Sequence, residues 1–284
     1  MNIQSLSIVV PTGHCWNNCF YCVSRMHCED YGSKLSNGIL TSSYVNRIKY
    51  VRDNGCNVMM LTGTAEPQQN MPFIRNLLGT NNKLDRPFYN IEIQTTGSGM
   101  KDEDIAELNA LGVTTLALSI SSFDIERNQA IIRMPEAKKN SYYDLIESAH
   151  NVGMNVRACL NLSDDFNRFE PAQYFKWAKG CGIEQLTFRK LYYLDMPFCD
   201  QRAWVANHQL EEIKFHRIVE YIKQNGTPIA RLPFGYIQYS LGGISTLVDD
   251  NCMSKNEIDN FKYMILRPNG HLYSRWDDKG SLVF

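Results

Sequence analysis

The chain has 284 residues, of which 44% are hydrophobic, and it carries 29 Lys and Arg against 30 Asp and Glu. This composition excludes a disordered chain and is sufficient for one large domain or two small ones. The balanced charge gives no electrostatic reason to expect nucleic acid or an anionic membrane as a partner. We expect no membrane association, because no apolar run is long enough to span a bilayer and the first residues lack the pattern of a signal peptide.

Short β-rich runs alternate with helical patterns through the first two thirds of the chain. The six predicted strands are residues 5–10, 57–61, 89–94, 115–120, 156–161 and 185–192. The predicted helices are residues 42–54, 71–78, 102–111, 142–151, 171–179 and, as one long helix, about 204–224. Six strand–helix units predict an α/β fold with a parallel sheet, and their regular period favours a partial (β/α)6 TIM-like barrel.

The pattern changes after residue 195. Two apolar segments, residues 263–267 and 271–274, flank Pro268-Asn269-Gly270 and predict a β-hairpin with Asn-Gly at its turn. We therefore expect a barrel core at residues 1–195. A C-terminal β-rich extension at residues 196–284, built from the helix and the hairpin, is expected to pack on this core.

Three cysteines stand close together directly after the first predicted strand. Cys15, Cys19 and Cys22 form a C-x3-C-x2-C cluster, and Tyr21 precedes the last cysteine. Three thiolates can bind three irons of a [4Fe–4S] cluster and leave the fourth iron open for chemistry. Nine cysteines with a single tight group fit a metal site in a reducing compartment better than a disulfide scaffold, so we expect a cytoplasmic protein.

A zinc site is the main alternative for these cysteines. His14, His27 and Cys28 are near enough in the sequence to supply a fourth ligand. The chain has no second C-x2-C pair, which zinc ribbons and fingers favour. After residue 195 only Cys199 and Cys252 remain, too few for a second cluster, so we expect one cluster.

Polar segments follow the other predicted strands. Because the carboxyl ends of parallel strands meet at one edge, we expect these segments to surround one barrel mouth. They are the segment from Gly63 to Pro67 after the second strand, Thr95-Thr96-Gly97, and residues 119–122, 161–163 and 189–192.

The cysteine loop and the segment after the second strand resemble the radical S-adenosylmethionine (SAM) superfamily. The family's loop is C-x3-C-x-Φ-C, with Φ aromatic, and the four residues of the loop fit it. Its second landmark is a Gly-Gly-Glu-Pro type turn, and Gly63-Thr64-Ala65-Glu66-Pro67 is a degenerate version that keeps the acid and the proline. The resemblance covers the chain through about residue 195.

The resemblance implies a role for the motif residues. Cys15, Cys19 and Cys22 would each ligate one iron, and the fourth iron would take SAM. Tyr21 would lie near the adenine. The turn of Thr64, Ala65 and Glu66 would hold the methionine amino group through backbone carbonyls and the Glu66 side chain.

Strand order alone implies four further contacts with SAM. Ser119 and Asn161 would contact the ribose or the methionine carboxylate, and Arg189 would pair with that carboxylate. The backbone near Tyr192 would contact the adenine. Other interpretations stay open, since Glu66 can be a turn acid, Ser119 and Asn161 can satisfy strand ends, and Arg157 is an equal candidate for the carboxylate.

The implied activity is reductive cleavage of SAM at the cluster to a 5′-deoxyadenosyl radical, which takes hydrogen from a substrate. An electron donor such as flavodoxin or ferredoxin is implied as a partner. Neutral charge and a compact chain favour a small-molecule or nucleotide substrate. The alternatives are a peptide- or protein-modifying enzyme of the same superfamily, and a non-catalytic iron–sulfur or zinc sensor.

Overall fold

A computed structural model describes residues 2–26, 40–193, 199–232, 235–250 and 260–284. Within these residues, eleven strands join one sheet in the order β11-β10-β1-β2-β3-β4-β5-β6-β9-β8-β7. The strands are β1 (Asn2–Val9), β2 (Val58–Thr62), β3 (Asn90–Thr95), β4 (Thr115–Ile120), β5 (Asn155–Leu162), β6 (Gln185–Lys190), β7 (Thr227–Arg231), β8 (Ile237–Leu241), β9 (Ile244–Asp249), β10 (Asn260–Leu266) and β11 (Leu272–Tyr273). The helices are α1 (Val23–Met26), α2 (Ser42–Asp53), α3 (Met71–Asn81), α4 (Asp102–Ala110), α5 (Ile125–Ile132), α6 (Tyr142–Asn151), α7 (Pro171–Gly180), α8 (Asp200–Asn207) and α9 (Glu212–Asn225).

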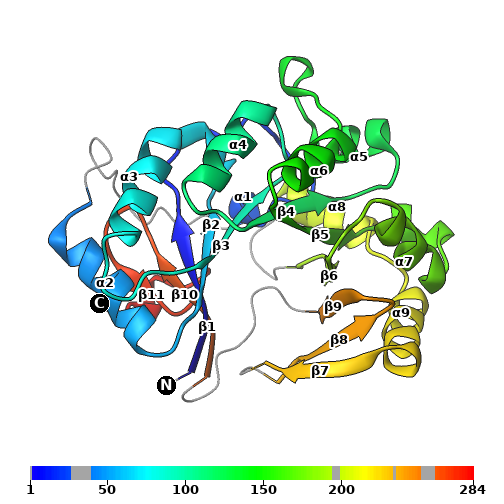
Figure 1. Cartoon of the computed structure of the whole chain (residues 1–284). Coiled ribbons are helices and arrows are strands. Elements are labelled where there is room, and N and C mark those ends of the chain that lie inside the picture. The colour runs from blue at the N-terminus through cyan, green and yellow to red at the C-terminus, as the bar shows by residue number, and fades with distance from the viewer. Residues whose placement is uncertain (1, 27–39, 194–198, 233–234, 251–259) are drawn as a thin grey trace.

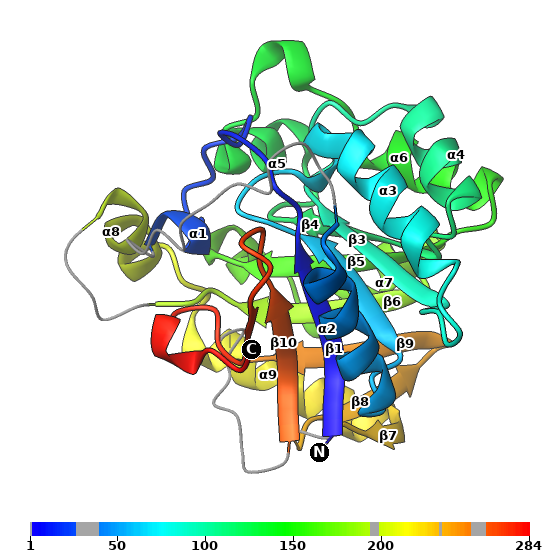
Figure 2. The same cartoon turned by 90° about the vertical axis from the view of Figure 1, so that its left-hand side faces the viewer.

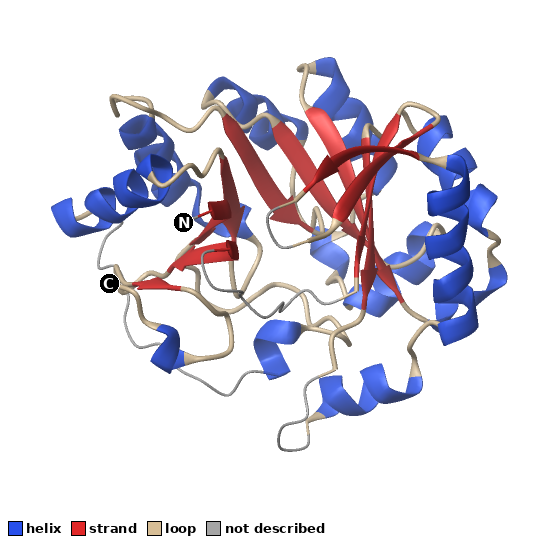
Figure 3. Cartoon of the chain, turned by 90° about the horizontal axis from the view of Figure 1, so that it is seen from below, coloured by secondary structure: helices blue, strands red, loops and turns tan. Residues whose placement is uncertain are grey.

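The strands from β10 through β1 to β6 and on to β9 form a parallel block. Strands β1 to β6 follow one another both in the sequence and in the sheet. The block curves into an open arc, and helices cover its outer face (Figures 1 and 3). The prediction of an α/β fold with a partial barrel is confirmed.

Alternation along each strand separates an apolar outer layer from a more polar interior. In β1, Leu6 and Ile8 are fully buried and belong to the main hydrophobic core, which also contains Tyr44 and Ile48 of α2. Ser7 lies between these leucine and isoleucine side chains in the sequence and therefore faces the opposite side, the interior of the arc. The same alternation brings polar side chains from neighbouring strands together inside the barrel.

The predicted helix at residues 204–224 is wrong, because the structure has two helices there, α8 and α9. The segment between them pairs with the end of β5. The amide of Leu210 donates to the carbonyl of Leu162 at 3.4 Å, and the amide of Asp164 donates to the carbonyl of His208 at 2.9 Å. These contacts require extended backbone and end the first helix. Helices α1 and α5 were not predicted.

Residues after 195 add strands to both ends of the parallel block. Strand β10 lies parallel to β1, and the two run side by side in Figure 2. It turns back into β11 through Pro268-Asn269-Gly270, where Gly270 has a φ of 80°. The antiparallel strands β7, β8 and β9, which the sequence did not predict, attach through β9 to β6. No helix in the described ranges is long and apolar enough to cross a membrane.

Candidate active site

The cysteine loop begins where β1 ends, at the carboxyl edge of the parallel strands. Cys15, Cys19 and Cys22 are free thiols of intermediate exposure. The amide of Cys22 donates to the carbonyl of Cys19 at 3.2 Å, and the amide of Arg25 donates to the carbonyl of Cys22 at 3.1 Å, so the loop winds directly into α1. The amide of Phe20 donates to the carbonyl of Ile131 at 3.2 Å, which ties the loop to α5.

The three thiols are close enough to influence one another electrostatically. Burial raises the pKa of Cys19 well above its usual value, and the charges of Cys22, Glu66 and Cys15 raise it further. Burial also raises the pKa of Cys15 and of Cys22. Three thiols that repel one another's thiolate forms suit a site that a positively charged group neutralises, because metal ligation deprotonates cysteine.

The arrangement also fits a cluster better than one ion. Among the residues that the structure describes, no three or more His, Cys, Asp or Glu side chains are grouped to hold a single metal ion. In a [4Fe–4S] cluster each thiolate instead binds a different iron. The three thiols of the loop therefore suit the predicted group.

Tyr21 connects the loop to the ends of two strands. Its hydroxyl accepts a hydrogen bond from Ser121 at 2.7 Å and from the amide nitrogen of Asn161 at 3.2 Å. Burial raises the pKa of Tyr21 well above its usual value. The structure thus brings Asn161 to the cysteine loop, together with Ser121. Ser119, which the sequence favoured, lies on β4 with intermediate exposure.

The turn after β2 is organised by a buried carboxylate. Glu66 is 5% exposed and accepts hydrogen bonds through both carboxylate oxygens. Its donors are the Asn17 amide (3.1 Å), the Gln68 amide (3.2 Å), the Thr96 backbone amide (3.1 Å), the Thr96 hydroxyl (2.8 Å) and the Thr95 hydroxyl. The protein's own groups therefore occupy this carboxylate. Thr64 is exposed and Ala65 is half-buried in the same turn.

Arg189 points into the interior from β6 and pairs with a buried acid. Its Nε lies 3.3 Å from Oδ2 of Asp249 on β9. Arg157, the alternative arginine, forms an ion pair with Glu92 on β3, and Gln94 donates to the same Glu92 oxygen at 2.8 Å. Tyr192 follows the end of β6 and is half-buried.

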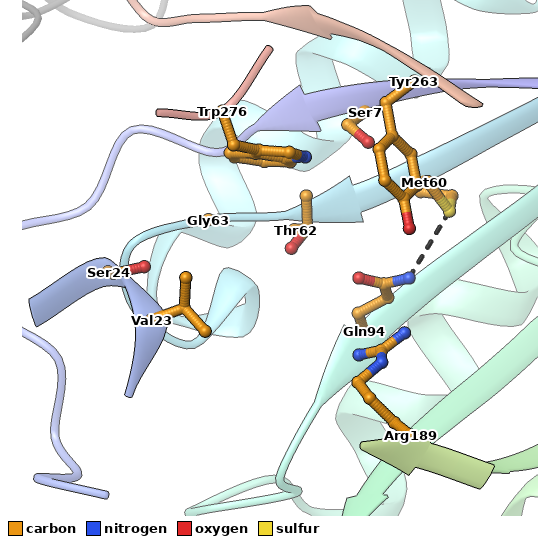
Figure 4. Close-up of a pocket in the computed structure, with 10 residues that line it drawn as sticks. All are labelled: Ser7, Val23, Ser24, Met60, Thr62, Gly63, Gln94, Arg189, Tyr263 and Trp276. Carbon is orange, nitrogen blue, oxygen red and sulfur yellow. Dashed lines mark hydrogen bonds between the residues drawn. The ribbon is translucent and has the colours of Figure 1, made fainter. Parts of the chain in front are cut away.

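A cavity of about 170 Å³ opens inside the barrel beside these residues (Figure 4). The interior strands supply Ser7, Met60, Gln94 and Arg189, and Gln94 lies 3.4 Å from the Met60 sulfur. Tyr263 and Trp276 of the C-terminal segment form the opposite wall, and Thr62, Gly63, Val23 and Ser24 lie toward the cysteine loop and the turn after β2.

One hydroxyl in this cavity has no partner. Ser7 is fully buried, and its oxygen makes no hydrogen bond within the described part of the chain. A buried hydroxyl without a partner is costly, so a ligand that reaches it gains from pairing with it.

Sequence reasoning did not single out Asn17, Thr96, Ser98 or Ser121 as site residues. Thr96 and Ser121 lie in the polar segments expected at the barrel mouth, which is the signal that could have identified them. Asn17 lies inside the C-x3-C spacing, where the family pattern leaves the residue type free.

The fold and the site define an open α/β barrel with a three-cysteine loop at the carboxyl end of its first strand. The sequence pattern of the radical SAM superfamily matches residues 9–164, more than half of the 284 residues. The chain therefore belongs to the radical SAM superfamily. Its members are enzymes that use a [4Fe–4S] cluster and SAM, and this chain is a radical SAM enzyme.

Several solved structures share the fold. SuiB from Streptococcus suis is 14% identical with a TM-score of 0.58, and the match covers 95% of this chain and 60% of SuiB. The structure titled anSMEcpe with bound AdoMet is 13% identical with a TM-score of 0.62, covering 100% of this chain and 74% of that one. Coproporphyrinogen III oxidase (HemN) from Escherichia coli is 12% identical with a TM-score of 0.52, covering 80% and 54%.

These identities are evidence for a shared fold alone. The chain spans about three fifths of the length of SuiB. None of the curated protein sequences compared with the chain matches it.

Proposed function

We propose that this chain holds a [4Fe–4S] cluster through Cys15, Cys19 and Cys22 and removes a hydrogen atom from a small-molecule or nucleotide substrate. The observation that carries the proposal is the convergence of three thiols beside the Glu66 turn at the carboxyl ends of the strands. When bound, the cluster and SAM together supply the one-electron cleavage that starts the reaction.

The chain's own residues bind and orient. We infer that the backbone of Thr64 and Ala65, rather than the Glu66 carboxylate, faces the methionine amino group, because five protein donors already occupy that carboxylate. Tyr21, held by Ser121 and Asn161, is the proposed support for the adenine.

The remaining predicted SAM contacts stay proposals. Arg189 faces the cavity from β6, where it is available to a carboxylate beside its pair with Asp249. Ser119 and Tyr192 rest on strand order alone. We no longer favour Arg157 as an equal candidate, because it is engaged by Glu92.

Basic side chains beside the cysteine loop support an acidic electron donor, such as flavodoxin or ferredoxin. The Arg133 guanidinium lies 5.3 Å from the centre of the Phe20 ring, and the Lys138 ammonium lies 4.1 Å from that of the Trp16 ring. Arg25 and Arg133 are exposed. Positive charge around a cluster loop steers a negatively charged carrier toward it.

The cavity supports a compact substrate. A volume of about 170 Å³ with one unpaired hydroxyl suits a small molecule, or one residue of a larger one. A peptide substrate is the second candidate, since SuiB was solved bound to precursor peptide SuiA and anSMEcpe was solved with bound peptides. We also propose a reducing, cytoplasmic location, which the free thiols support.

One assay separates an enzyme from a non-catalytic sensor. The protein is reconstituted anaerobically with iron and sulfide, then given dithionite and SAM, and 5′-deoxyadenosine is measured. We expect the product from the wild-type chain, none from Cys19→Ala, and wild-type amounts from Cys181→Ala, a matched control outside the loop. An intact cluster without 5′-deoxyadenosine would contradict the proposal.

A second assay addresses the substrate. Deuterium-labelled nucleotides, small metabolites and peptides are offered in turn, and transfer of deuterium into 5′-deoxyadenosine is followed by mass spectrometry. Transfer from peptides alone would select the second candidate.

A further inference from the structure

Asn17 lies in the middle of the C-x3-C spacing and is 1% exposed. Its neighbours Cys15 and Cys19 are the proposed iron ligands, so its side chain is well placed to fix the backbone between two of them. A polar side chain this buried must find partners among protein groups.

The partners of Asn17 use every polar atom of its amide group. Its nitrogen donates to Glu66 Oε1 at 3.1 Å and to the Thr96 hydroxyl oxygen at 2.8 Å. Its oxygen accepts from the Ser98 hydroxyl at 2.8 Å. One side chain of the cysteine loop thus reaches the turn after β2 and the loop after β3.

The direction of these hydrogen bonds requires an amide at position 17. Glu66 offers only acceptors, and its other four hydrogen bonds come from donors on Gln68, Thr95 and Thr96. A carboxylate at position 17 would face the Glu66 carboxylate at hydrogen-bond distance, and two like charges there repel.

We propose that Asn17 is a positioning residue that sets the cysteine loop for the cluster and fastens that loop to the turn that faces SAM. This inference rests on the proposed cluster site. It goes beyond it by assigning to a neutral amide the coupling between the two halves of the site.

The first test compares Asn17→Ala with Asn18→Ala. Asn18 is the adjacent residue of the same type, and its amide oxygen makes no hydrogen bond within the described residues. The reconstituted variants are challenged with an iron chelator, and the rate of cluster loss is followed by absorbance. We expect Asn17→Ala to lose its cluster about tenfold faster or more, because it leaves buried groups of Glu66, Thr96 and Ser98 unpaired. Asn18→Ala should stay within about twofold of wild type.

The second test exchanges the two partners. Asn17→Asp alone should lose the cluster faster than Asn17→Ala, and Glu66→Gln alone should also lose it faster than wild type. In the double variant Asn17→Asp/Glu66→Gln, an amide and a carboxylate face each other again with their places exchanged. We expect this variant to recover at least about tenfold of the loss seen in Asn17→Asp.

A readout independent of folding follows the coupling to SAM. The EPR spectrum of the reduced cluster is recorded with and without SAM. We expect the SAM-dependent change to require a higher SAM concentration in Asn17→Ala, and to return to the wild-type range in the double variant. If a single variant does not fold, the double variant alone still decides, because it should fold and respond to SAM as wild type does.

Two results would overturn the inference. One is equal cluster loss in Asn17→Ala and Asn18→Ala. The other is a double variant no better than Asn17→Asp. Failure of the proposed function is a different result, since the wild-type chain itself would then take up no cluster or show no SAM-dependent spectrum.

Discussion

The Nζ atom of Lys262 lies 2.7 Å from Oδ1 of Asp249, so a salt bridge joins β10 to β9, the two strands at opposite ends of the parallel block. The two side chains are only 5% and 4% exposed. Arg189 approaches the second oxygen of the same carboxylate. One buried acid therefore binds a cation from β6 and a cation from β10, and it fastens the two ends of an open barrel across its interior.

We expect Asp249→Asn to lower the free energy of unfolding by ~3–5 kcal/mol, because it leaves two buried cations without their shared carboxylate. Lys262→Met should cost less, since Arg189 still faces Asp249. Urea denaturation of the metal-free chain measures both. Lys223→Met, which breaks an exposed pair with Glu220, is the control and should cost less than ~1 kcal/mol. Equal effects of Asp249→Asn and Lys223→Met would contradict this account.

The same carboxylate predicts how stability depends on pH. Burial alone would raise the pKa of Asp249, but Arg189 and Lys262 outweigh burial, and the pKa lies below its usual value. A lowered pKa in the folded chain stabilises it above the unfolded value of about 3.9, and this stability disappears as the pH falls through the folded value. The difference in unfolding free energy between wild type and Asp249→Asn should therefore shrink below about pH 4. A difference that stays constant from about pH 7 to about pH 3 would exclude this contribution.

Gly97 follows β3, close to the cysteine loop. It has a φ of 83°, and a Cβ atom there would lie 2.2 Å from a methyl carbon of Leu145. Gly97→Ala should lower the unfolding free energy by ~2–4 kcal/mol, the sum of backbone strain and a steric clash. Gly112→Ala separates the two terms, since Gly112 has a φ of 103° and nothing within 4 Å of such a Cβ. It should cost ~1–2 kcal/mol, and a cost equal to that of Gly97→Ala would rule out the clash.

Arg133 tests the surface proposed for the electron donor. We expect Arg133→Glu to slow 5′-deoxyadenosine formation about tenfold with reduced flavodoxin and to leave the rate with dithionite within about twofold, because the charge acts on encounter with the carrier. Raising the salt concentration should reduce the difference between wild type and variant. Arg217→Glu on α9 is the control. An equal loss with both reductants would point to damage in the loop, where Arg133 contacts Phe20.

The strand pattern predicted the part of the fold where buried apolar residues dominate. Strand β4 was predicted at residues 115–120, as observed, because five of its six side chains are buried. Strand β7 could not be found in this way, since all of its residues are exposed and it contains Pro228. Its pairing depends on β8 and on the distant strand β6, through β9.

The site was predictable where its chemistry depends on spacing along the chain. Cys15, Cys19 and Cys22 need only a short loop, and the sequence shows it directly. Asn17 and Ser121 depend instead on which distant side chains meet them, Glu66 in one case and Tyr21 in the other. Strand order brought attention to β4 but not to the correct residue on it, because the position where the strand ends in space depends on the curvature of the sheet.

The pairing of β1 with β10 has a consequence for how the chain folds. Asn2 and Asn260, at the start of the two strands, are 258 residues apart in the sequence and joined by a hydrogen bond of 3.0 Å. Contacts between such distant segments close a large loop and form late. The strand that leads into the cysteine loop therefore gains its second neighbour only after most of the chain has folded. Cluster insertion before that moment would meet a loop whose supporting strand is still an exposed edge, which predicts that maturation follows folding.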